Sequence, residues 1–259
     1  MSDETPFLYF EVLPPAPLRE YVHAYWGFDV RDAIVGTRHV VWPDGCLSLL
    51  CRVTPGGECH AGFSGPRTEP LEVPVASGER YRGVRLWPWA IRPLLDVDPA
   101  SVRDRNGAVT TLLGPDAGLL QDLRAEQVLP ALEELLLARA QRAGAVDAIV
   151  RGAAEAIARS AGKLRIADVA AAAAVGERQL RRRFRSVTGL SPKEYARVRR
   201  LRSTAVARLG GGESWSRLAA QHGFADQAHL VREVATMTGL TPGGFADRLR
   251  LIEHRDVRP

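Results

Sequence analysis

A short stretch of sequence occurs twice in the C-terminal half, first as Thr188-Gly-Leu-Ser-Pro192 and then as Thr238-Gly-Leu-Thr-Pro242. Each copy follows a pattern typical of a helix, a tight turn and a second helix. Glycine ends a helix readily because it accepts left-handed backbone angles, and proline fits the first turn of the next helix. The unbroken segment between the copies predicts one helix about 27 Å long. The sequence therefore predicts two helix-turn-helix units, residues 166–188 and 214–238, joined by a linker helix over residues 192–209.

The second helix of the first unit, expected over residues 177–188, has a strongly basic face. Leu180, Phe184 and Val187 repeat at helical spacing, so we expect them to face the core. The outward positions are then Arg178, Arg181, Arg182 and Arg185. A guanidinium matches the two acceptors of guanine and also neutralises phosphate, so this face suits DNA. The alternative is an ordinary solvated face, but residues 178–185 hold five arginines with no acidic residue among them.

The corresponding helix of the second unit, expected over residues 226–238, is less basic. Leu230 and Val234 are expected to face inward. The outward positions are Gln227, Ala228, Val231 and Arg232. Glutamine can bind adenine through two hydrogen bonds, and alanine or valine can contact the methyl group of thymine. We therefore expect this helix to read bases with a larger apolar contribution than the first.

The two halves of the chain carry opposite net charge. Residues 145–259 hold 21 Lys and Arg against 11 Asp and Glu, a net charge of +10, and the remainder holds 14 against 19, a net charge of −5. This asymmetry favours a C-terminal half that binds a polyanion. The N-terminus lacks the pattern of a signal peptide, and no apolar run is long enough for a membrane span. We expect a cytoplasmic protein without a membrane partner.

The N-terminal half differs from the C-terminal half in its pattern of apolar and turn-forming residues. Short apolar runs at residues 39–42, 47–53 and 84–87 are separated by Pro and Gly turns, which is typical of strands. Residues 128–142 and 146–160 show helical spacing instead. The predicted fold class is α+β. A mixed strand and helix domain, residues 1–142, precedes an all-α domain, residues 145–259.

Residues 163–250 resemble the DNA-binding domain of the AraC/XylS family. In the first unit and the linker helix, the resemblance rests on Ala167-Asp-Val-Ala170, Arg178-Gln-Leu-Arg-Arg-Arg-Phe184, Thr188-Gly-Leu-Ser-Pro-Lys-Glu-Tyr195 and Arg200-Leu201. In the second unit it rests on Gly223-Phe-Ala-Asp-Gln-Ala-His-Leu230 and Thr238-Gly-Leu-Thr-Pro242. It implies a sequence-specific transcription regulator, an activator or a repressor, whose two units contact successive major grooves. The family pattern places base contacts at positions that match Arg178, Arg181 and Arg182 in the first unit. In the second unit it points to Gln227, Ala228, Val231 and Arg232. The implied partners are double-stranded operator DNA, a second subunit in a homodimer and, for an activator, RNA polymerase.

Three residues depart from the pattern of this family. Ala174 occupies the first turn where a glycine is usual, and an alanine at positive φ is strained. Gly176 replaces the usual Ser or Thr cap of the recognition helix. Val234 stands where an aromatic residue usually ends the second motif. None of the three removes a group expected to face DNA, so we expect them to affect local stability.

Residues 7–140 resemble the sensory-type domain that precedes this module in some family members. The matching stretches are Leu18-Arg-Glu-Tyr-Val-His-Ala-Tyr-Trp26, Trp42-Pro-Asp-Gly45 and Gly83-Val-Arg-Leu-Trp-Pro88. The resemblance implies binding of a small-molecule effector, dimerisation, or both. Trp42, Trp87 and Trp89 could line an apolar effector pocket, since aromatic side chains offer a ligand large contact areas. The alternative for these three side chains is plain core packing.

The remaining motifs give little support for catalysis. Cys46, Cys51, Cys59 and His60 match no zinc-binding spacing, so no metal site is expected. The sequence has no nucleophile elbow, zinc-protease motif or phosphate-binding glycine loop, and we expect neither a cofactor nor enzyme activity. One rival interpretation stays open. In it, an N-terminal enzyme or a cysteine-based damage or redox sensor is fused to the same DNA-binding module.

Overall fold

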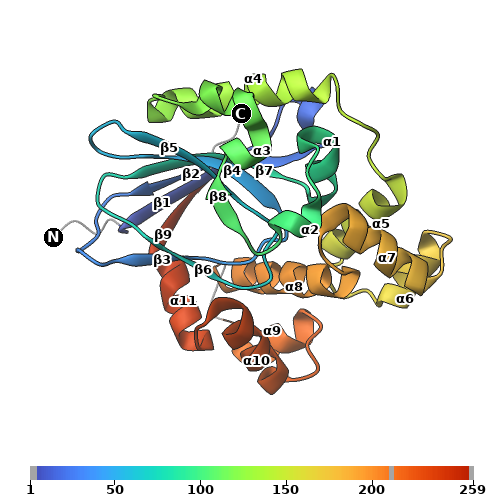
Figure 1. The fold of residues 1–259 in the computed structure, drawn as a ribbon. Helices are drawn as coiled ribbons and strands as arrows, with labels where there is room; N and C mark the ends of the chain where they lie inside the picture. The colour runs from blue at the N-terminus through green and yellow to red at the C-terminus, as the bar shows by residue number, and fades with distance from the viewer. Residues whose placement is uncertain (1–4, 210–212, 257–259) are drawn as a thin grey trace.

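A computed structural model describes residues 5–209 and 213–256. Figure 1 shows a strand-rich part whose lower and right-hand sides are flanked by helices. The main sheet has seven strands in the order β8-β5-β4-β7-β2-β1-β9, and β3 pairs with β6 in a separate ribbon. The strands are β1 (Phe7–Val12), β2 (Val22–Val30), β3 (Arg38–Val41), β4 (Leu47–Val53), β5 (Cys59–Ser64), β6 (Leu71–Pro74), β7 (Arg80–Leu86), β8 (Asn106–Ala108) and β9 (Ile252–Asp256).

One short 3₁₀ turn, η1 (Ala16–Leu18), lies near the N-terminus, and every other helix follows β7, with β8 after α2 and β9 after α11. Those flanking the sheet are η2 (Pro88–Ala90), α1 (Ile91–Leu95), α2 (Pro99–Val102), α3 (Thr110–Leu113), η3 (Gly114–Leu120) and α4 (Ala125–Ala140). Those of the C-terminal half are α5 (Ala148–Arg159), α6 (Ile166–Ala172), α7 (Glu177–Thr188), α8 (Pro192–Leu209), α9 (Trp215–Gln221), α10 (Gln227–Thr238) and α11 (Pro242–Arg250). The predicted α+β fold class is confirmed, with a sheet-rich domain followed by a helical one.

The two faces of the main sheet pack against different elements. Side chains alternate along a strand, so Leu47 and Leu49 of β4 face one side while Ser48 and Leu50 face the other. Leu47 and Leu49 are fully buried in the core that α4 covers. The β3–β6 ribbon lies across the opposite face (Figure 1). A cavity lies between the ribbon and the sheet.

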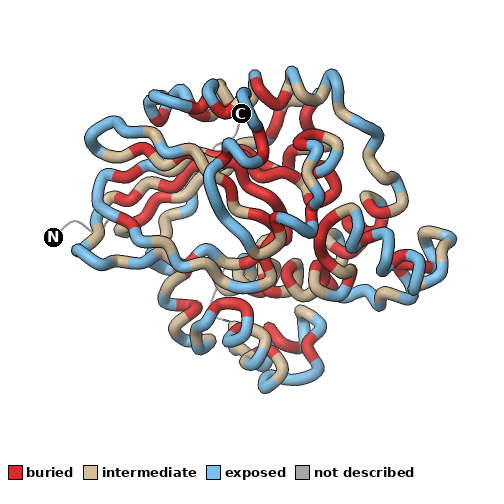
Figure 2. The backbone as a smooth tube through the Cα atoms, in the orientation of Figure 1, coloured by how far each residue is buried: buried red, intermediate tan, exposed pale blue. Residues whose placement is uncertain are grey.

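The first helix-turn-helix unit shares its core with the sheet domain. One cluster of buried side chains extends from Leu18 through Leu132 to Phe184 and Tyr195, and Figure 2 shows buried positions running from the sheet into α5, α7 and α8. An ion pair of 2.7 Å joins Arg103, which follows α2, to Glu194 of α8. The sheet domain and the first unit are therefore packed as one body.

The second unit has a core of its own. Its buried cluster includes Leu218, Leu230, Val234 and Phe245, and from the N-terminal half Trp42 packs against it. The Trp42 and Phe245 rings meet edge to face at 4.7 Å. The two helix-turn-helix units are thus held to the N-terminal half in different ways.

The last described strand returns to the first. Strand β9 pairs with β1 in parallel, with Phe7 opposite Ile252. An ion pair of 2.6 Å between Arg31 and Glu253 lies beside this pairing. The sequence analysis did not predict the strand. Within residues 5–209 and 213–256, no helix is both long and apolar enough to cross a bilayer.

Candidate functional site

The recognition helix of the first unit, α7, has the bounds that the sequence predicted. Leu180 and Phe184 are fully buried, and Gly189 ends the helix at a φ of 75°. The Thr188 hydroxyl donates to the Phe184 carbonyl at 2.8 Å and accepts from Leu190 N at 3.1 Å. These contacts fix the direction of the helix. The basic side chains exposed on it are Arg178, Arg181, Arg182, Arg183 and Arg185.

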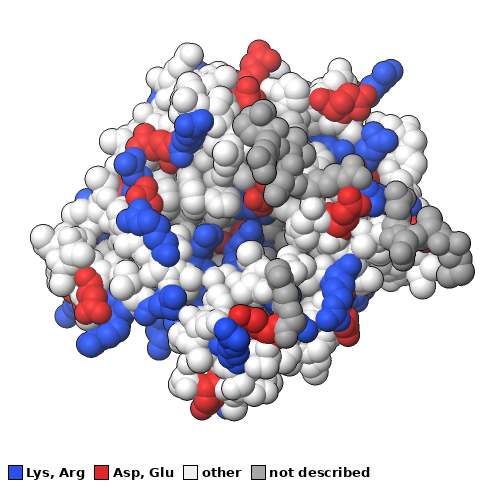
Figure 3. All heavy atoms as spheres, turned by 180° about the vertical axis from the view of Figure 1, so that it is seen from behind, with Lys and Arg blue, Asp and Glu red and all other residues white. Residues whose placement is uncertain are grey.

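Intramolecular ion pairs engage only part of this basic face. Arg181 pairs with Glu177 one turn earlier, and Arg183 pairs with Asp147 at 2.5 Å. Arg178, Arg182 and Arg185 form no ion pair with any residue that the structure describes. Acidic and basic side chains are interspersed over the back of the molecule (Figure 3). Exposed guanidinium groups without a carboxylate partner are available to phosphates and base edges.

The second recognition helix, α10, repeats the same local structure. Asp226 caps it, accepting from His229 N at 2.6 Å. At its end Thr238 donates to the Val234 carbonyl and accepts from Leu240 N at 3.2 Å, as Thr188 does in the first unit. Gln227, Ala228 and Arg232 are exposed and Val231 is half-exposed, whereas Leu230 and Val234 are fully buried. The sequence repeat therefore corresponds to a structural repeat.

A basic groove between the two units was missed by the sequence analysis. Lys163 and Lys193, the only two lysines of the chain, both line it together with Arg165. Two further groove residues already have partners within the protein: Arg197 forms an ion pair with Glu233 at 2.8 Å, and Arg200 donates to the Gly162 carbonyl. The signal in the sequence was the occurrence of two isolated lysines in an arginine-rich chain. Because they are thirty positions apart in the sequence, the sequence did not show that they line one groove.

The departures from the family pattern have visible effects on the backbone. Ala174 adopts a φ of 53°, the left-handed conformation that strains an alanine. Gly176 caps α7 without any side-chain hydrogen bond, in contrast to Asp226 at the start of α10. The first unit therefore forms its turn and helix start with less favourable residues than the second.

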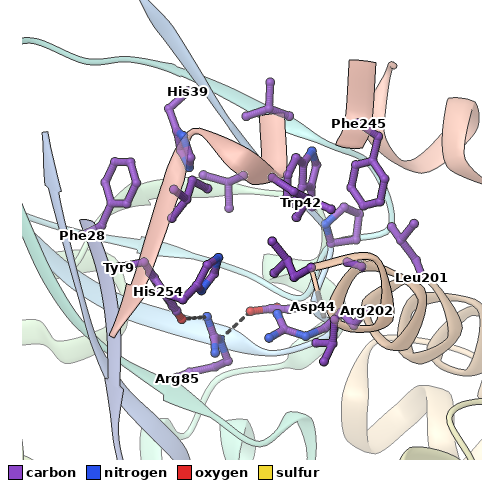
Figure 4. Close-up of a pocket in the computed structure, with 18 residues that line it drawn as sticks. Tyr9, Phe28, His39, Trp42, Asp44, Arg85, Leu201, Arg202, Phe245 and His254 are labelled. Atoms are coloured by element: carbon purple, nitrogen blue, oxygen red, sulfur yellow. Dashed lines mark hydrogen bonds and ion pairs between the residues drawn. The ribbon is translucent and has the colours of Figure 1, made fainter. Parts of the chain in front are cut away.

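A cavity with two lobes lies behind the β3–β6 ribbon. The inner lobe, about 170 Å³, lies between the ribbon and the sheet. The outer lobe, about 190 Å³, extends to α8 and α11 through Leu201 and Phe245. Both lobes share Tyr9, Phe28 and Trp42 as walls (Figure 4), so the space reaches from the sheet to the second unit.

The polar centre of this cavity is Arg85, which is only 7% exposed. It forms an ion pair with Asp44 at 2.6 Å and donates to the Tyr9 hydroxyl at 3.1 Å (Figure 4). It also forms an ion pair with Glu11 at 2.5 Å. Burial opposes ionisation of Glu11, but Arg85 and Tyr9 outweigh it and lower the pKa of Glu11 to about 2. Burial also lowers the pKa of His39 to about 4. At neutral pH Arg85 is therefore matched by two carboxylates, and His39 is uncharged.

The three tryptophans proposed for an effector pocket are not brought together. Trp42 lines both lobes of the cavity. Trp87 and Trp89 instead stack on each other at 4.8 Å beside the main core, where Trp89 donates to the Glu20 carbonyl at 2.9 Å. Of the three, Trp42 alone faces this cavity.

The cysteines are poorly placed for thiol chemistry. Cys46 and Cys51 are buried, and Cys59 is half-buried. Burial raises the pKa of Cys46 to about 12 and also raises that of Cys51. The thiolate is the reactive form of cysteine, so these two thiols are expected to be inert. No group of three or more His, Cys, Asp or Glu side chains arranged to hold a metal occurs in the described part of the chain.

Comparison with known proteins agrees with this arrangement. Residues 169–248 match the family model "Helix-turn-helix domain", and residues 10–107 match "Domain of unknown function (DUF6597)". The search of curated proteins finds no match.

Several solved structures of regulators are similar to the chain. One is a transcriptional regulator with an AraC-type DNA-binding domain from Chromobacterium violaceum, at 20% identity over 39% of this chain and 91% of that one, with a TM-score of 0.37. Another is the C-terminal domain of the response regulator AraT from Geobacillus stearothermophilus, at 21% identity over 39% and 85%, with a TM-score of 0.37. A third is ToxT from Vibrio cholerae with a bound unsaturated fatty acid, at 11% identity over 92% and 100%, with a TM-score of 0.47.

The repeated helix-turn-helix units and the family match define a helix-turn-helix DNA-binding protein. Residues 10–107, which match the second family, precede this domain in the chain.

Proposed function

We propose that the protein binds a specific operator by placing α7 and α10 in two successive major grooves. The observation that carries this proposal is the structural repeat, in which both helices are fixed by the same Thr-Gly-Leu contacts and expose their outward residues. A second helix of a helix-turn-helix unit reads base edges with its N-terminal residues. Arg178, Arg181 and Arg182 would do so in the first unit, with Arg185 near the phosphates. Gln227, Ala228, Val231 and Arg232 would do so in the second.

The basic groove supports this mode of binding. A duplex that presents two major grooves on one side brings its sugar-phosphate backbone between them. Lys163, Arg165 and Lys193 lie between the units and can neutralise that backbone. Such contacts position the protein, while the base contacts of α7 and α10 supply the specificity.

We further propose that the protein responds to an effector. Residues 1–142 would bind a small molecule in the two-lobed cavity and carry any homodimer contact, and residues 145–259 would bind DNA. The outer lobe touches α8 and α11, so a ligand there would contact the helices that hold the second unit. In an activator the DNA-bound protein would also contact RNA polymerase. The role is regulatory, and no catalytic step is proposed.

The test is selection of bound sequences from a random duplex pool with the full-length protein at two salt concentrations. The expected result is two short boxes about one helical turn apart. Arg182→Ala should weaken the sequence preference only in the first box, and Arg232→Ala only in the second. Arg92→Ala, which changes an exposed arginine of α1 paired with Asp98, serves as the control. Recovery of a single box, or equal effects of both variants on both boxes, would contradict two-groove binding.

A further inference from the structure

Three hydrogen-bond donors on the walls of the inner lobe have no acceptor. They are Arg67 Nη1, Trp26 Nε1 and Trp42 Nε1, and each of these atoms is buried without a hydrogen-bond partner among the described residues. A buried donor left without an acceptor costs about 1–3 kcal/mol, and native proteins leave few of them. Their occurrence on one cavity indicates that the cavity is built for a molecule that supplies acceptors.

Arg67 is the most informative of the three because it is a buried cation. It is 8% exposed, and its Nε donates to the Glu69 carbonyl at 3.1 Å. No carboxylate of residues 5–209 or 213–256 forms an ion pair with it. Asp44, the carboxylate on the same cavity wall, is already engaged by Arg85 and by Cys46 N at 2.9 Å. The inner lobe therefore has a positive charge that a ligand could match.

The rest of the inner lobe is suited to a flat apolar body. Its walls include the rings of Tyr9, Phe28 and Tyr81 with the aliphatic side chains of Val41 and Val73. Its volume of about 170 Å³ limits the ligand to a small molecule. His39 adds an uncharged ring to this wall, since burial lowers its pKa to about 4.

We propose that the effector is a small planar carboxylate, rich in acceptors and without donors, whose carboxylate binds Arg67. The indole N–H groups of Trp26 and Trp42 face its acceptor atoms, and its apolar body lies among the aromatic walls. Trp42 also packs on Phe245 of α11. An occupied inner lobe therefore fixes one of the side chains through which the N-terminal half contacts the second unit. This inference rests on the proposed effector response and assigns its ligand class.

The experiment is isothermal titration calorimetry of the full-length protein with benzoate, cinnamate, 4-methoxycinnamate and coumarin-3-carboxylate, each paired with its methyl ester. An ester keeps the flat body and removes the charge. At least one acid is expected to bind with a Kd below about 1 mM and about tenfold more tightly than its ester. Absence of binding by every acid, or equal affinity of acid and ester, would overturn the proposal.

Variants locate the binding site. Arg67→Gln is expected to weaken acid binding at least about tenfold and to leave ester binding unchanged, whereas Arg67→Lys should restore part of the loss. Trp26→Phe keeps an aromatic ring but removes the pyrrole ring with its N–H, so it tests the lobe if Arg67→Gln does not fold. Arg105→Gln, at an exposed position nearby, is the matched control. An unchanged acid affinity in both Arg67→Gln and Trp26→Phe would place the ligand elsewhere.

Operator binding measured with and without the acid separates this inference from the proposed function. If the acid binds through Arg67 but operator affinity does not change, the ligand class stands and the effector response fails. If the operator is bound and no acid binds, DNA recognition stands and the ligand class fails.

Discussion

Gly189 and Gly239 are a matched pair that tests how the first unit is held to the sheet domain. Each ends a recognition helix at nearly the same positive φ, 75° and 70°. An alanine Cβ at position 189 would lie 2.7 Å from the carbonyl oxygen of Pro99, whereas at position 239 it would meet nothing within 4 Å. In Gly239→Ala the free energy of unfolding should therefore fall only through the strain of an alanine in the left-handed conformation, by about 1–2 kcal/mol. Gly189→Ala has the same strain, and its clash with Pro99 should lower the free energy of unfolding by about 1–3 kcal/mol more.

The assay is urea unfolding of the full-length protein and both variants, followed by tryptophan fluorescence and circular dichroism. The free energy of unfolding should fall further for Gly189→Ala than for Gly239→Ala, by at least about 1 kcal/mol. Because the two sites share their helix-capping role, the difference reports the contact with Pro99. Losses that agree within about 0.5 kcal/mol would refute the conclusion that the first unit is packed tightly against the sheet domain.

Three further predictions concern stability, DNA binding and pH. Ala174→Gly should raise the free energy of unfolding by about 1 kcal/mol by removing strain at a φ of 53°, and an unchanged melting temperature would contradict it. Arg182→Ala should weaken operator binding by about 1–3 kcal/mol in gel-shift titrations. An equal loss on random DNA would show that Arg182 contacts only phosphate. Burial lowers the pKa of His23 from 6.5 to about 3, so between these values the unfolded chain binds a proton that the folded protein does not. His23 should then lower the free energy of unfolding by up to about 1.4 kcal/mol per pH unit as the pH falls below about 6.5, and His23→Asn should remove this contribution.

The helical half was predictable because its signals are local. The bounds of α7 and α8 follow from neighbouring residues, namely a glycine after the first helix and a proline at the start of the second. The strained φ of Ala174 was anticipated in the same way, from a glycine position filled by alanine. In each case the determining residues lie within a few positions of the feature.

The cavity and the groove were not predictable in this way. Trp42 faces the cavity while Trp87 and Trp89 pack beside the main core, and that distinction depends on which face of the sheet each residue occupies. Arg67 gave no signal in the sequence, because its lack of a carboxylate partner depends on residues from distant strands. Lys163 and Lys193 likewise line one groove only in the folded protein.

The parallel pairing of β1 with β9 has a consequence for synthesis of the chain. The ribosome synthesises β1 first and β9 last among the described elements, so the outer edge of β1 has no neighbour until β9 has been made. A nascent sheet with an open edge can pair with the edge of another chain. Shortening the chain before Ile252 would leave that edge open permanently. Such a truncated protein should form intermolecular aggregates even where both helix-turn-helix units remain intact.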